Sequence, residues 1–135
     1  MDVSKTEVLR AQSWESLHFE SVKWVSDIAL WKIELNFFQK LLDKYGSSFE
    51  MVEDKKEIDH FQNLITYYNG ELLDEFRQLV RRHENHLAKD FAVKGEVNEQ
   101  EYRLKHKELK VRIRAFDDEF KAYKKEFFAF IERAL

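Results

Sequence analysis

Large apolar side chains recur every three or four residues along three segments of this chain, and this spacing predicts three α-helices. The first stripe is the densest, and it consists of Ile28, Trp31, Leu35, Phe38, Leu42 and Tyr45. Steps of three and four residues keep side chains on one face of a helix. We therefore expect this stripe to form a buried seam around which the other helices pack.

Two longer stripes follow the first. The second, within residues 48–92, is formed by Ile58, Phe61, Ile65, Tyr68, Leu72, Phe76, Leu79, His83 and Leu87. The third, within residues 98–134, is formed by Tyr102, His106, Leu109, Ile113, Phe116, Phe120, Tyr123, Phe127 and Ile131.

The pair Asn69-Gly70 interrupts the second stripe, and Asn-Gly often marks a turn. The stripe nevertheless keeps its phase, because Ile65, Leu72 and Leu79 are spaced by sevens. We expect one helix with a weak point at this pair. The alternative is a break there, which would give four helices.

The expected helix boundaries come from glycines and capping residues. Gly46 and Gly95 stand where left-handed C-caps would end two helices. Capping-box spacing occurs at three helix starts, namely Ser4 with Glu7, Ser47 with Glu50, and Asn98 with Glu101. These signals predict helices at about 5–45, 48–92 and 98–134. Three helices of similar length with short loops predict an all-α, antiparallel up-down-up bundle that forms a single domain, residues 1–135.

Composition adds several constraints. Proline is absent, which suits long helices, and cysteine is absent, which excludes disulfides, thiolate metal sites and thiol nucleophiles. No signal sequence opens the chain, and no apolar run approaches the roughly 20 residues that span a bilayer. A cytoplasmic protein without membrane association is therefore expected. The net charge of −3 argues against general affinity for nucleic acid.

Two segments carry a family resemblance. They are WKIELNFFQ at residues 31–39 and HFQN at residues 60–63, and the phenylalanine-rich third stripe adds to them. Together they resemble an uncharacterised family of small helical bacterial proteins that are rich in aromatic residues and histidine. The resemblance covers most of the chain and implies a helical fold, and it implies no activity.

The histidines are the first candidates for chemistry. His83 and His86 are three residues apart, which excludes the H-E-x-x-H zinc motif. Two E-x-x-H pairs, ending at His18 and His60, are typical of ferritin-like di-iron sites. If the first and second helices pair antiparallel across Gly46, residue i of the first lies opposite about residue 96 − i of the second. His18 and His60 are then ~27 Å apart along the bundle, which is too far to share a metal.

His83 and His106 are the stronger pair. If residue j of the second helix lies opposite about 190 − j of the third, the two histidines face each other, with Trp14 and Tyr102 within about a turn. Facing imidazoles could form a pH-sensitive contact or supply two ligands to a divalent metal. We favour a partly buried pair with satisfied hydrogen bonds at the end of the bundle over a metal site, because no inward carboxylate is expected at that level to complete the metal's ligands. No other cofactor is expected.

A basic cluster is the second candidate. It combines Arg77, Arg81 and Arg82 of the second helix with Lys107, Lys110 and Arg114 of the third. Such a cluster could contact phosphates of a nucleic acid. The charges are spread around the third helix, and acidic residues of the first helix are expected nearby, so a solvated, salt-bridged face is favoured. Phosphate-binding loops and nucleophile motifs are absent from the sequence.

The third candidate is a second apolar stripe on the first helix. Leu30, Ile33 and Phe37 point away from the seam, and Leu41 extends the stripe at its edge. A contiguous apolar patch usually marks an interface, and a two-fold homodimer is its simplest closed arrangement. The competing interpretation is that the other helices wrap further around the first helix and cover this stripe.

These observations favour a non-enzymatic interaction or structural protein that associates with itself or with another helical protein. The alternatives are a metal-binding helical protein that uses His83 and His106, and a nucleic-acid-associated protein that uses the basic cluster.

Overall fold

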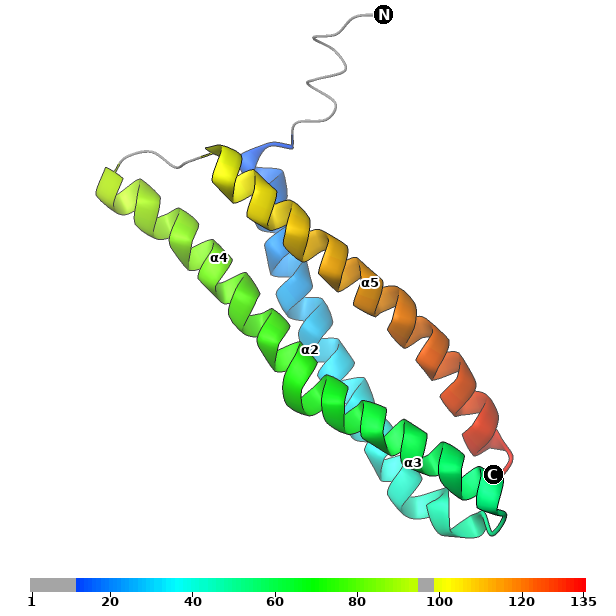
Figure 1. Ribbon diagram of the computed structural model, residues 1–135. Coiled ribbons are helices and arrows are strands. Elements are labelled where there is room, and N and C mark those ends of the chain that lie inside the picture. The colour runs from blue at the N-terminus through cyan, green and yellow to red at the C-terminus, as the bar shows by residue number, and fades with distance from the viewer. Residues whose placement is uncertain (1–11, 95–98) are drawn as a thin grey trace, which may run out of the picture.

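The computed structural model describes residues 12–94 and 99–135, and within these ranges all regular structure is helical (Figure 1). The elements in chain order are α2 (Trp14–Tyr45), the 3-10 helix η1 (Gly46–Ser48), α3 (Val52–Tyr67), the π-helical turn η2 (Tyr68–Leu72), α4 (Leu73–Lys94) and α5 (Glu99–Glu132). The predicted all-α fold class is confirmed.

The predicted seam of α2 is buried where α2 packs against α5 and against α3 and α4. In Figure 1, α3 and α4 follow one another along one line, and α2 and α5 lie alongside them. The Trp31 ring lies 4.9 Å from that of Phe116, and the Phe38 ring lies 4.7 Å from that of Phe127. Every predicted seam residue is buried except Tyr45, which is half-buried. The third predicted stripe is buried along its whole length on α5.

The first helix begins later than predicted. Gln12 and Ser13 are not helical, and α2 starts at Trp14, where the Ser13 side chain accepts a hydrogen bond from the N–H of Ser16. Ser13 is therefore the N-cap, a role for which a short hydroxyl side chain is well suited. The predicted capping box at residues 4–7 lies outside the described residues, as do Gly95 and Asn98 of the other boundary.

The connection after α2 also differs from the prediction. Gly46 has φ −57° and ψ −37°, so the expected left-handed cap is wrong, and the chain continues into η1. The Ser47–Glu50 capping box is wrong as well, because α3 starts after Met51 without a side-chain cap. Within this connection Phe49 is buried, and its ring stacks 4.3 Å from that of Phe130 on α5. This apolar contact holds the connection against α5.

The weak point expected at Asn69-Gly70 is the π-helical turn η2. Before it, the buried residues Phe61, Ile65 and Tyr68 follow helical spacing; after it, the next buried residue is Leu73, a step of five. A π-helical turn holds one residue more than an α-helical turn, so it rotates the buried face by one position. Leu72 and Leu79 of the predicted stripe therefore lie at the edge of the core and pack against it. Both are half-buried, and Leu73 and Val80 are fully buried instead.

The π-helical turn is also a polar contact point with α2. The Lys32 ammonium donates to the carbonyl of Asn69 at 2.8 Å and to Asp74 Oδ1 at 2.7 Å. The Asn69 side chain donates to Asn36 Oδ1 at 2.8 Å. The predicted register placed Lys32 opposite residue 64, whereas its contacts lie five and ten residues further along, so the register is wrong by about one and a half to three turns at this level. The connection through η1 and Phe49 contributes residues that the prediction did not count.

We expect deletion of Gly70 to be tolerated. Removing one residue from η2 restores helical spacing between Tyr68 and Leu73, and a Cβ at Gly70 would meet no atom within 4 Å, so the site is open. The free energy of unfolding should change by less than about 1 kcal/mol, measured by urea denaturation with circular dichroism.

Deletion of the exposed Asp118 in α5 is the matched control. It turns the residues that follow by about 100° relative to Phe116 and removes Phe120 and Tyr123 from the core. We expect a loss of at least ~3 kcal/mol. An equal loss in both deletion variants would contradict the assignment of η2 as a one-residue insertion.

Candidate functional site

The outer face of α2 carries a continuous exposed apolar stripe. Its large members, which we call the outer stripe, are Phe19, Val22, Leu30, Ile33 and Phe37. The exposed small residues Ser26 and Ala29 lie between them at the same helical spacing. Phe19 is 71% exposed, Ile33 is 65% exposed and Phe37 is 52% exposed. A contiguous apolar face of this length is unusual on the surface of a monomeric protein.

Three of the four predicted interface residues lie in the outer stripe. Leu30, Ile33 and Phe37 are exposed, whereas Leu41 is half-buried and packs against the core at the edge of the stripe. The competing interpretation, that neighbouring helices cover this face, is wrong for the described residues. The prediction missed Phe19 and Val22. Continuing the same three- and four-residue steps toward the start of the helix would have found them.

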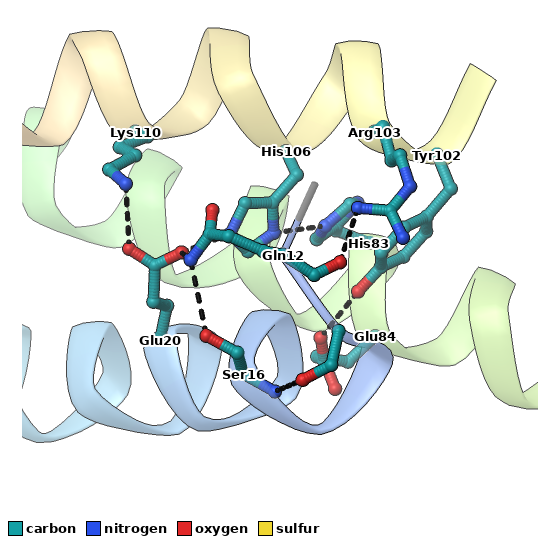
Figure 2. A network of polar contacts seen from close by, with 10 residues as sticks. Gln12, Ser16, Glu20, His83, Glu84, Tyr102, Arg103, His106 and Lys110 are labelled. Carbon is teal, nitrogen blue, oxygen red and sulfur yellow. Dashed lines mark hydrogen bonds and ion pairs between the residues drawn. The ribbon is translucent and has the colours of Figure 1, made fainter. Parts of the chain in front are cut away.

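The predicted histidine pair is present at the opposite, inner side of the molecule. His83 of α4 and His106 of α5 face each other, with 3.0 Å between Nε2 of His83 and Nδ1 of His106 (Figure 2). Only 6% of His83 and 2% of His106 is exposed. The prediction that these histidines meet inside the bundle is confirmed.

A carboxylate completes the pair on the α2 side. Glu20 Oε1 lies 3.2 Å from Nε2 of His106, and its other oxygen is 3.0 Å from the Lys110 ammonium (Figure 2). The Gln12 side chain donates to Glu20 Oε1 at 2.8 Å. The expectation that no inward carboxylate lies at this level is therefore wrong. Glu20 is one of the acidic residues of the first helix that were expected near the basic cluster, and steps of four residues place it on the same face as the buried Trp24 and Ile28.

The contacts fix the direction of the hydrogen bonds. An ionised Glu20 only accepts, so Nε2 of His106 carries the hydrogen, and its Nδ1 is then free to accept from Nε2–H of His83. Both histidines are neutral in this arrangement. The chain of donors runs from His83 through His106 to Glu20, and both nitrogens of His106 have a partner.

Aromatic rings and a second carboxylate surround the pair. The His83 ring stacks on Tyr102 at 4.1 Å, and the Trp24 ring lies 4.6 Å from that of His106. The Tyr102 hydroxyl donates to Glu84 Oε1 at 3.0 Å, and the other Glu84 oxygen contacts His18. Trp14 lies 5.3 Å from Tyr102, so the predicted proximity of these rings to the histidines is confirmed.

Burial is the main cause of the shifted histidine pKa values. It lowers the pKa of His83 to about 4, and the charge that His106 would carry acts in the same direction. Burial also lowers the pKa of His106, although Glu20 partly opposes this. Burial raises the pKa of Glu20, but contacts from Lys110, Gln12 and His106 together outweigh it and hold the pKa below its usual value. The folded state thus favours neutral histidines beside an ionised glutamate.

The geometry of the pair is that of a hydrogen bond. The two facing nitrogens are close enough to share a hydrogen, and the remaining nitrogen of His106 is occupied by Glu20. Among the described residues, no group of three or more histidine, aspartate or glutamate side chains converges as metal ligands would. The arrangement is a buried polar contact that joins α2, α4 and α5.

The predicted basic cluster is divided between two grooves. Arg82 lines the groove between α4 and α5, whereas Lys107, Lys110 and Arg114 line the side of α5 that faces α2. Lys110 pairs with Glu20, and Arg77 pairs with Asp74 at 3.2 Å. Arg81 is exposed on α4. The six residues therefore do not form one continuous cationic surface.

Comparison with known proteins adds no identification. No protein-family model, curated protein or solved structure matches this chain. Within the described residues, no helix has the length and apolar character needed to cross a membrane.

The histidine pair should make stability depend on pH. Because the pKa of His83 falls from 6.5 in the unfolded chain to about 4 in the folded protein, the unfolded state binds more protons between these values. The free energy of unfolding should fall as pH drops from about 6.5 to 4, by on the order of 2 kcal/mol. Urea denaturation across this range measures it.

The double substitution His83→Gln with His106→Gln should flatten this part of the profile, and His60→Gln, at an exposed histidine, should leave it unchanged. Glu20 and Glu84 also have lowered pKa values, so a further loss below about pH 4.5 should remain in every variant. A double variant with the wild-type slope between pH 6.5 and 4.5 would contradict the buried neutral pair.

Proposed function

We propose that this chain is a single-domain, antiparallel up-down-up helical bundle that acts as a non-enzymatic interaction protein in the cytoplasm. Its partner is a second copy of itself, and the contact is the outer face of α2. The observation that carries this proposal is the outer stripe, five large apolar side chains exposed along one helix face.

The energetics of the outer stripe support an interface. Covering a fully exposed large apolar side chain contributes roughly 1.5–3 kcal/mol, so several such residues in one contact offset the entropy lost on association. Aromatic residues are enriched in protein interfaces, and the outer stripe contains two of them, Phe19 and Phe37. The inner face of α2 is already used by the core, so a substitution on the outer face should change association without changing the fold.

The two alternative functions have less support. A metal held by His83 and His106 would have to displace the hydrogen bond between them and would find Glu20 on the far nitrogen of His106. A nucleic acid would meet basic residues that are divided between two grooves and partly neutralised by Glu20 and Asp74.

We expect Phe37→Glu to dissociate the dimer and leave the monomer folded. The substitution places a charge within the proposed contact, so the dissociation constant should rise by roughly 30-fold or more, which corresponds to the ~2 kcal/mol of an important apolar contact. Light scattering coupled to size-exclusion chromatography gives the mass, and circular dichroism checks the fold.

Val111→Glu is the matched control. Val111 is 61% exposed on α5 and lies outside the outer stripe, so the same change of charge there should leave association unchanged. If both variants dissociate equally, or if neither differs from the wild type, the outer face of α2 is not the contact.

A further inference from the structure

We infer that the two copies meet through α2 in an antiparallel orientation, with the two-fold axis passing between Ala29 and Leu30. This inference rests on the proposed self-association and specifies its geometry. Two independent features of the outer face carry it, which are the charges at its ends and the sizes of the side chains between them.

The charges at the two ends of the outer face are opposite. Glu15 lies exposed at its beginning, and Lys40 and Lys44 lie exposed at its end, all at the helical spacing of the outer stripe. In an antiparallel pair related by an axis between Ala29 and Leu30, Glu15 of each copy lies opposite Lys44 of the other. A parallel pair in register would place Glu15 against Glu15 and Lys44 against Lys44, where like charges repel.

Side-chain size favours the same arrangement. With this axis, Ser26 of one copy lies opposite Ile33 of the other, and Val22 lies opposite Phe37. Ala29 lies opposite Leu30, so small residues are near the axis and each meets a larger one. A parallel pair would set Ser26 against Ser26 and Phe37 against Phe37, which leaves a gap at one level and crowding at another. Packing that alternates large and small side chains fills an interface more completely.

Phe19 fits the antiparallel arrangement as well. It is the most exposed member of the outer stripe and lies opposite Lys40 of the partner, one turn from the partner's Phe37. The alkyl part of a lysine side chain covers an aromatic ring while its ammonium stays in water. Phe128 of α5 is also exposed, and its ring lies 5.2 Å from that of the buried Phe38.

Disulfide trapping in the full-length chain tests the orientation directly. The protein has no cysteine, so single cysteines can be introduced without background. We expect an equal mixture of the Ser26→Cys and Ile33→Cys variants, under mild oxidation, to form the mixed disulfide between positions 26 and 33, identified by mass spectrometry. Disulfides that join 26 to 26 and 33 to 33, without the mixed species, would overturn the antiparallel register.

A charge exchange provides the second test. Glu15→Lys and Lys44→Glu should each raise the dissociation constant by about three- to tenfold, and the double variant should return it to the wild-type value. A parallel pair predicts no effect of either single substitution, because like charges would face each other before and after. That result would overturn the register and leave self-association standing, whereas a wild type that is monomeric at every concentration would overturn the proposed function itself.

Discussion

The packing of α2 from two sides is the constraint on which the rest of the structure depends. Its inner side chains contact the aromatic rings of α5, as in the pairs Trp31–Phe116 and Phe38–Phe127, and its flank holds η2 through Lys32. A helix that packs against α5 and against α3 and α4 still has one face toward solvent. On α2 this face carries the outer stripe, so the same helix that organises the core also presents the apolar surface from which we argue self-association.

The polar network near the N-terminal end of α2, formed by Glu20, His106 and His83, follows from the same packing. Glu20 lies on the side of α2 that faces α5, where Lys110 and His106 meet it. His83 reaches His106 from α4, so one hydrogen-bonded chain joins three helices. A buried polar network of this kind is costly when any member lacks a partner, and it therefore favours one relative placement of the helices over alternatives. Its neutral histidines make that placement sensitive to acid.

The sequence predicted the elements that depend on periodicity and missed those that depend on neighbours. The seam of α2, the stripe of α5, the facing histidines and much of the outer stripe all follow from spacing alone. The choice of Leu73 and Val80 over Leu72 and Leu79 could not be predicted, because all four are apolar and only the packing of η2 against α2 distinguishes them. The inward position of Glu20 could have been found from spacing, because steps of four lead back from the buried Ile28 through Trp24 to Glu20. Its partners Lys110 and His106 are on α5 and depend on the packing of the two helices.

Sedimentation equilibrium of the wild-type chain tests the central claim, that the outer face of α2 binds a second copy. The chain has a mass of 16.4 kDa. The account predicts a mass twice this value at concentrations above about 10 µM, with a reversible return toward the monomer on dilution. A single species of 16.4 kDa at every concentration up to about 1 mM would contradict it.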